Sequence, residues 1–124
     1  MITIKKIEDM NEINAYLQVQ GFNHTFGMEQ FMGMYDGDRL IGLGSIELCV
    51  TKVYLNFIHT EENTHAFNYG LAKSLLNMAD LSGVKTVYGN NPDLNVLYMA
   101  LRFVTENDEY MLSLEGYFTE ESCH

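Results

Sequence analysis

Cysteine is scarce in this sequence, and the two cysteines present form no pattern. Cys49 and Cys123 are the only ones among 124 residues, too few for the disulfide framework of a small secreted domain. The four histidines, His24, His59, His65 and His124, also lack the spacing of a metal site. The sequence therefore predicts neither structural disulfides nor a bound metal.

Basic residues are scarce as well. Seven Lys and Arg residues stand against seventeen Asp and Glu residues, which gives a formal net charge of −10. A surface of this sign repels the phosphate backbone of nucleic acids and anionic lipid headgroups, so we expect no nucleic-acid and no membrane partner. The same field favours a cationic substrate such as an amine.

Long apolar runs are missing too. No stretch reaches the roughly 18 consecutive apolar residues of a membrane-spanning helix, and residues 1–9 alternate polar and apolar types instead of forming the apolar core of a signal peptide. Hydrophobic residues make up 47% of the chain and charged residues 19%, which is typical of a globular protein. We expect one cytoplasmic domain at residues 1–118, followed by an acidic tail at 119–124.

Hydrophobic periodicity predicts a strand, a helix and three further strands in the first half of the chain. Asp9 followed by Glu12 has the spacing of a capping box at the start of a helix that continues to Leu17. Asp36-Gly37-Asp38 is a hairpin turn, because Asp-Gly readily adopts positive φ angles. The expected strands are residues 2–5, 31–35, 40–46 and 52–59.

The second half begins with a polar linker at residues 60–64 and continues into the clearest helical pattern of the chain. We expect this helix to begin near Asn68 and to end before Gly83, which suits the C′ position. Asn91 and Pro92 are expected to start another helix. Short strands are expected at 84–88 and 110–114, which makes the fold a mixed, mostly antiparallel sheet flanked by helices.

The start of the long helix is a candidate anion site. Free amide groups and the positive end of the helix dipole meet there, and a glycine lets a phosphate approach the backbone. An ordinary helix start that contains a glycine is the alternative. The candidate phosphate-binding residues are Asn68, Tyr69, Gly70, Leu71, Ala72, Lys73 and Ser74.

Two segments resemble the GCN5-related N-acetyltransferases (GNATs). The family's segment Arg or Gln, x, x, Gly, x, Gly or Ala corresponds to residues 67–72, with Gly70 and Ala72 at the small positions and Phe67 at the first. The family's Asn, Leu-Tyr and Gly-Phe positions correspond to Asn91, residues 97–98 and residues 102–103, with arginine in place of the glycine. The resemblance spans roughly residues 2–114 and implies a GNAT-like acetyltransferase fold.

The resemblance also implies acetyl-CoA as the co-substrate and assigns roles to particular residues. Tyr98 matches the tyrosine that protonates the departing CoA thiolate, and Asn91 matches the asparagine that contacts the cofactor. A packing tyrosine is the alternative for Tyr98. The general base stays open among four residues eligible by position, of which His59 has a suitable ordinary pKa near 6.5; they are His59, Glu61, Glu62 and Glu47.

The resemblance implies an N-acetyltransferase that acts on a small-molecule or peptide amine. The alternative is a non-catalytic domain of the same fold that binds CoA or a protein partner, motivated by Phe67 and Arg102. The segment 21–30, where the family commonly shapes its acceptor pocket, is short. The acceptor pocket is therefore expected to be open or completed by a second subunit of a homodimer.

Overall fold

The computed structural model describes residues 1–24 and 27–118 of the chain; the tail expected at 119–124 lies outside this part. The described residues form one mixed sheet in the order β1-β2-β3-β4-β5-β7-β6. Every neighbouring pair is antiparallel except β4 and β5, which are parallel. The strands are β1 (Ile2–Ile7), β2 (Met28–Asp36), β3 (Arg39–Cys49), β4 (Lys52–Thr60), β5 (Thr86–Gly89), β6 (Val104–Glu106) and β7 (Glu109–Ser113).

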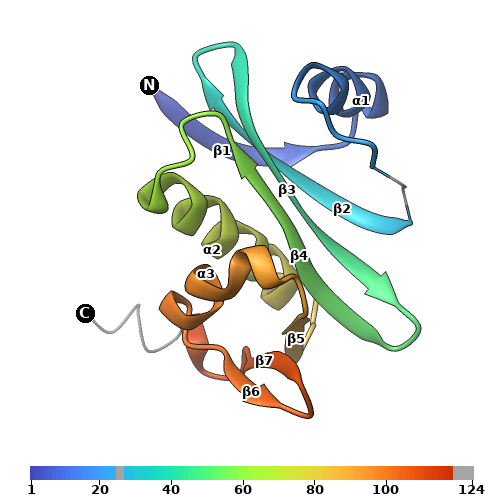
Figure 1. Cartoon of the computed structure of the whole chain (residues 1–124), viewed down its shortest axis with the longest axis vertical. Helices are drawn as coiled ribbons and strands as arrows, with labels where there is room; N and C mark the ends of the chain where they lie inside the picture. Colours follow the sequence, from blue (N-terminus) through green and yellow to red (C-terminus); the bar gives the residue numbers. More distant parts are fainter. Residues whose placement is uncertain (25–26, 119–124) are drawn as a thin grey trace.

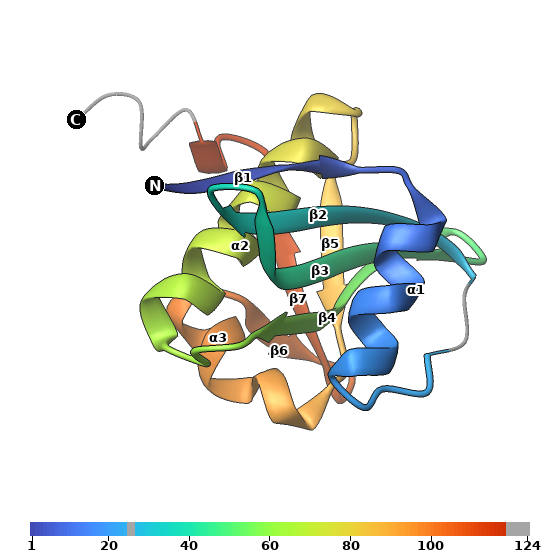
Figure 2. The ribbon, with the colours of Figure 1, turned by 90° about the horizontal axis from the view of Figure 1, so that it is seen from above.

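Helices cover both faces of the sheet (Figure 1; Figure 2). Helix α1 (Met10–Val19) buries Ile13 and Leu17 against β2 and β3 on one face. Helix α2 (His65–Leu81) packs Leu75 and other apolar side chains on the opposite face, together with the short helices η1 (Pro92–Leu94) and α3 (Asn95–Ala100). None of the helices that the structure describes combines the length and the apolar character needed to cross a membrane.

The predicted order of elements is confirmed except for one strand. Strand β6 is missing from the sequence prediction because its three residues are all exposed and show no apolar alternation. It pairs with β7 through a two-residue turn in which Asn107 and Asp108 have φ angles of 52° and 65°. Such a pair with positive φ is typical of tight hairpins, so Asn107-Asp108 was the overlooked sign of this strand.

Predicted helix ends are largely confirmed. Asp9 caps α1 by accepting from the Asn11 amide at 3.0 Å, and Asn91 caps η1 by accepting from the Asp93 amide at 3.0 Å. Gly83 has a φ of 89° after α2, where the Val84 amide reaches the Ala79 carbonyl at 3.0 Å. This is the left-handed C′ residue expected from the glycine.

The predicted start of α2 was wrong. The helix begins at His65 instead of near Asn68. Thr64 is the N-cap, and its Oγ1 accepts from the Phe67 amide at 3.2 Å. A threonine hydroxyl at this position satisfies one of the amides that would otherwise have no partner, so the helix gains its first turn without a glycine.

Arg102 provides a test of backbone strain. It follows α3 as the C′ residue with a φ of 71°, and the Phe103 amide closes the motif on the Tyr98 carbonyl at 2.9 Å. A side chain with a Cβ destabilises this left-handed conformation by roughly 1 kcal/mol. Arg102→Gly should therefore raise the free energy of unfolding by about 1 kcal/mol, measured by urea denaturation. Arg102→Ala is the control: an equal gain there would attribute the effect to the lost arginine side chain instead of to φ.

Candidate active site

Strands β4 and β5 run side by side only briefly and then part. Their pairing is confined to Val53 with Val87 and Tyr54 with Tyr88, while β4 continues to Thr60. At the point of parting, β4 carries a β-bulge: Ser45 of β3 pairs with Phe57 and the next residue, Ile46, pairs with Leu55, so Asn56 is the extra residue. Bulges occur often beside active sites because they re-aim backbone groups.

Three asparagines connect this bulge to the loop after β5. The Asn56 Nδ2 donates to Asn90 Oδ1 at 2.6 Å, and the Asn90 amide donates back to Asn56 Oδ1 at 2.9 Å. The Asn91 Nδ2 donates to the Asn56 carbonyl at 2.8 Å. The loop therefore holds the bulge in place after the strand pairing has ended.

Tyr98 of α3 reaches the same point from the helical layer. Its hydroxyl lies 2.5 Å from the Leu55 carbonyl and 3.0 Å from Asn56 Oδ1, and it accepts from the Asn91 amide at 3.4 Å. The side chain is fully buried, and burial raises the pKa of Tyr98 to about 12. The structure thus brings Tyr98 and Asn91 together at the parting of the strands, with the phenol protonated near neutral pH.

His59 lies further along β4, on the α1 face, with its ring centroid 4.9 Å from that of Phe22. Its Nε2 is 3.1 Å from Gln20 Oε1, while Gln20 Nε2 donates to Glu61 at 3.4 Å. Because the Glu61 carboxylate fixes the orientation of the Gln20 amide, His59 Nε2 is the protonated nitrogen and Nδ1 carries the lone pair. Burial lowers the pKa of His59. Asn56 lies three positions earlier in β4, which is about 10 Å along the strand.

The other candidate bases have different surroundings. Glu61 follows β4 and pairs with Arg39. Glu47 lies in β3, where a Cβ on Gly27 would contact its carboxylate, and Glu62 is exposed in the loop before α2. Among the described residues, no hydrogen bond joins any of these three carboxylates, or His59, to Tyr98 or Asn91. His59 is the candidate among the four that lies on β4 itself.

The expected anion-site residues need a correction in position. Because α2 begins at His65, the residues from Asn68 to Ser74 lie beyond its first turn, where amides donate within the helix. Leu71 and Ala72 are fully buried in the core. The amides that precede the first intrahelical bond, from the Asn68 amide to the Thr64 carbonyl, are instead those of residues 64–67, of which the Phe67 amide donates to the Thr64 hydroxyl.

The polar side chains of the expected anion-site set are also engaged within the protein. Asn68 accepts from the buried Thr60 hydroxyl at 2.6 Å, and the Ser74 hydroxyl donates to the Gly70 carbonyl at 3.1 Å. Lys73 Nζ lies over an aromatic ring, 5.7 Å from the Tyr69 centroid. These contacts tie α2 to β4 and to its own surroundings rather than leaving the groups available to a phosphate.

Sequence reasoning missed Asn56, Asn90 and Gly89 as members of this site. Asn56 is an ordinary polar residue within an alternating strand, and its importance comes from a bulge that depends on the pairing with β3. Gly89 lies so close to Tyr98 that a Cβ would overlap the phenol ring. The repeated asparagines at 90 and 91 after a strand were the one available sign of a polar loop.

Solved acetyltransferase structures share this fold over nearly the whole chain. An N-acetyltransferase from Staphylococcus aureus Mu50 is 18% identical with a TM-score of 0.67, covering 90% of this chain and 96% of its own. The ribosomal-protein-S18-alanine N-acetyltransferase from Escherichia coli is 15% identical with a TM-score of 0.65, covering 90% and 91%. An acetyltransferase from Bacillus subtilis in complex with CoA is 15% identical with a TM-score of 0.61, covering 92% and 99%.

The sheet order, the parted strands and these likenesses define a protein with the GNAT fold, as the sequence resemblance predicted. No family model and no curated protein matches the chain by sequence. At these identities the likeness establishes the fold, and the chemistry has to be argued from the chain's own residues.

Proposed function

We propose that this protein transfers the acetyl group of acetyl-CoA to a primary amine at the parting of β4 and β5. The observation that carries the proposal is the meeting of the Asn56 bulge with Asn91 and Tyr98 at that point. Active sites in α/β folds commonly lie where titratable and polar groups converge, and here they converge at the end of the strand pairing.

The reaction needs a nucleophile, a proton acceptor and donors for the developing oxyanion. The amine nitrogen attacks the thioester carbonyl carbon, the C–N bond forms, the C–S bond breaks and the sulfur leaves as a thiolate. We assign proton removal from the attacking nitrogen to His59 Nδ1 through water, because a lowered pKa keeps this imidazole neutral at pH 7. The oxyanion donor we assign is the Asn56 backbone N–H, which the bulge removes from the regular ladder.

Tyr98 receives a positioning role in this proposal instead of the acid role suggested by the sequence. A phenol whose pKa is raised to about 12 is a weaker acid than a thiol with a pKa near 8.5, so proton transfer to the thiolate is uphill. Such a thiolate can leave unprotonated and take its proton from water. The Tyr98 hydroxyl instead holds the Leu55 carbonyl and the Asn91 amide in fixed positions.

A non-catalytic domain that binds CoA or a protein partner is the second candidate. Its partner-binding form is favoured by the start of α2, where Glu61 and Glu62 precede the cap and no lysine or arginine lies in the first turn of the helix. Carboxylates at this position oppose a pyrophosphate that the helix dipole attracts. The CoA-binding form of this domain differs from the transferase only in turnover, whereas the form that binds a protein partner needs no CoA.

Two measurements test the proposed function. Acetyl-CoA should raise the melting temperature, because a ligand that binds the native state stabilises it by RT ln(1 + [L]/Kd), and a panel of primary amines should release free thiol. Ala66→Glu places a carboxylate at the exposed start of α2 and should abolish the shift, whereas the exposed Asn77→Glu on the same helix is the control of equal charge. A shift without thiol release would support the non-catalytic CoA-binding domain, and no shift at millimolar acetyl-CoA would refute both acetyl transfer and CoA binding and leave only the domain that binds a protein partner.

The titration of His59 gives a prediction about pH. The pKa of His59 is lowered in the folded chain, whereas the unfolded chain has the ordinary value near 6.5. The unfolded state therefore binds more protons between the two pKa values, and stability is lost as the pH falls below about 6.5. His59→Gln should flatten the decline in melting temperature between pH 7 and pH 5. If His59 is the base, kcat/KM in the wild type also falls with an apparent pKa below 6.5.

The control for this prediction is His65→Gln, which changes an exposed histidine at the start of α2. The decline in melting temperature between pH 7 and pH 5 should be flatter in His59→Gln than in His65→Gln. If melting temperature declines with falling pH as steeply in His59→Gln as in the wild type, the decline comes from other groups. The assignment of His59 as a neutral imidazole at pH 7 would then lose its support.

A further inference from the structure

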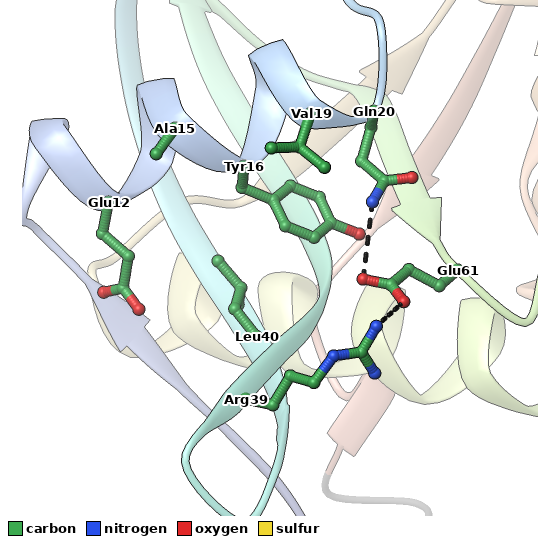
Figure 3. A pocket seen from close by; sticks show the side chains of 8 residues that line it. All are labelled: Glu12, Ala15, Tyr16, Val19, Gln20, Arg39, Leu40 and Glu61. Carbon is green, nitrogen blue, oxygen red and sulfur yellow. Dashed lines mark hydrogen bonds and ion pairs between the residues drawn. The ribbon is translucent and has the colours of Figure 1, made fainter.

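A pocket of about 350 Å³ lies between α1 and the start of β3, on the face of the sheet opposite α2 and α3 (Figure 3). Its volume is within the range of small-molecule sites. The ring of Tyr16 forms its inner wall, and the Tyr16 hydroxyl points toward Gln20 and Glu61 at one end of the pocket. This space is named the Tyr16 pocket below.

The Tyr16 hydroxyl is a buried polar group without a hydrogen-bond partner among the described residues. The side chain as a whole is only 7% exposed. Leaving such a hydroxyl unpaired destabilises a protein by about 1–3 kcal/mol, and an unsatisfied buried group calls for an explanation. A bound molecule that supplies the missing hydrogen bond is such an explanation.

The charges around the Tyr16 pocket favour a cation. Glu61 at one end takes a hydrogen bond from Gln20 at 3.4 Å and an ion pair from Arg39; a carboxylate has about four acceptor sites, so acceptor capacity remains. Glu12 stands at the other end. Two carboxylates against one guanidinium leave one negative charge in excess within the pocket. The phenol remains neutral, because burial and the nearby Glu61 raise the pKa of Tyr16.

The remaining walls of the Tyr16 pocket are apolar. Ala15 and Val19 contribute from α1, and Leu40 contributes from β3. The side chain of Val19 is 81% exposed, so part of this wall faces solvent at the mouth. A short hydrocarbon chain would cover apolar surface here at about 25 cal/mol for each Å² removed from water.

We propose that the Tyr16 pocket binds the ammonium group of a linear aliphatic amine, with the nitrogen held between the Tyr16 hydroxyl oxygen and the Glu61 carboxylate. The ammonium donates to both oxygens, and the alkyl chain lies against Ala15, Val19 and Leu40. The binding itself does not depend on acetyl transfer.

The site also has a consequence for the acceptor, which rests on the proposed function. Gln20 joins Glu61 to His59, so the Tyr16 pocket opens beside the candidate base on β4. A nitrogen held as an ammonium has no lone pair and cannot attack a thioester. An acceptor anchored here therefore carries a second amino group, which is the one that reacts.

The test is a titration of the complete chain, without acetyl-CoA, with three probes of equal length: n-butylammonium, 1-butanol and butyrate. Heteronuclear NMR should show saturable shifts at Ala15, Val19 and Leu40 with butylammonium, and at least ten-fold weaker binding of the alcohol and the carboxylate. Tyr16→Phe should weaken butylammonium binding about five-fold or more, the factor expected for one lost hydrogen bond. Glu61→Gln should weaken it at least ten-fold.

Stability provides a second readout of the same substitution. Because Tyr16→Phe removes an unpaired buried hydroxyl, the free variant should melt at a higher temperature than the wild type while binding the amine less well. Tyr54→Phe is the matched control, since its hydroxyl is 2.7 Å from Glu109 at another part of the sheet; it should leave butylammonium binding unchanged. Any of four results would overturn the proposal. Butanol could bind as tightly as butylammonium, or butyrate could bind more tightly. The NMR shifts could lie away from Ala15, Val19 and Leu40, or Tyr16→Phe could bind butylammonium with unchanged affinity.

The outcome is distinguishable from that of the proposed function. Amine binding at the Tyr16 pocket without thiol release from acetyl-CoA would leave the amine site standing and remove the transferase function. With turnover established, 1,4-diaminobutane should have a lower KM than n-butylamine in the wild type, and Tyr16→Phe should reduce this difference in KM. An equal KM for the two amines would refute the anchoring of the acceptor.

Discussion

Tyr98→Phe should lower the free energy of unfolding by about 1–3 kcal/mol. The substitution keeps the ring but removes the hydroxyl, so the Leu55 carbonyl loses a partner in a fully buried place and the Asn91 amide loses one in a partly buried place. Urea denaturation measures the loss. Tyr54→Phe is the control, because Tyr54 is only half-buried and its hydroxyl contacts a surface carboxylate.

The same variant decides between the two roles of Tyr98. For a positioning residue, turnover should fall less than about ten-fold at a temperature where the variant is folded, and the pH profile of kcat should keep its shape. A general acid would instead cost roughly 100-fold or more in kcat. If Tyr98→Phe loses 100-fold or more in kcat while its free energy of unfolding is unchanged, Tyr98 acts as the general acid. The positioning role assigned from its burial would then be contradicted.

Gly89→Ala should have a comparable or larger effect on stability. Its Cβ would fall on the ring and hydroxyl of Tyr98, and this ring is held on its other sides by Phe103 and Tyr110 at centroid distances of 5.0 and 4.7 Å. Overpacking of this kind destabilises proteins by about 1–3 kcal/mol. Displacement of the ring also breaks the hydrogen bond to Leu55, so CoA binding and turnover should decline with stability.

Gly70→Ala is the matched glycine control. A Cβ at Gly70 meets only the Ile4 side chain, at 3.8 Å, and glycine inside a helix is less favourable than alanine by about 0.5–1 kcal/mol. This variant should therefore be more stable than the wild type. If Gly89→Ala is as stable as the wild type, the Tyr98 ring can move without a loss of stability. If Gly70→Ala is less stable than the wild type, glycine is required at position 70 for a reason other than the geometry of the helix.

The regular elements could be predicted because their causes are local. Asp9, Asn91 and Gly83 act on backbone groups within a few residues of themselves, and the structure confirms all three caps. The boundary of α2 could not be placed from the glycine at 70, since a hydroxyl at Thr64 was sufficient to start the helix earlier. When a local sequence pattern contains two possible helix starts, as here near Thr64 and near Gly70, the pattern does not decide which of them begins the helix.

The candidate site was predictable only in part. Asn91 and Tyr98 were chosen by resemblance, and the structure places them in contact. The role of Tyr98 could not be read from the sequence, because a phenol changes its acidity with burial, and burial is a property of the packed layers. Glu61, Arg39 and Tyr16 lie far apart in the chain and meet only when α1 packs on the hairpin of β2 and β3.

The sequence by itself determined the order of strands and helices apart from β6, the acidic balance and the resemblance to the GNAT fold, because periodicity, caps and charge are properties of the sequence. The tertiary structure alone decided where β4 bulges, which amides at the start of α2 stay available, and which hydroxyl is buried with or without a partner. These properties arise from contacts between residues distant in sequence, such as Tyr98 with Leu55, and burial then sets their acidity and hydrogen bonding.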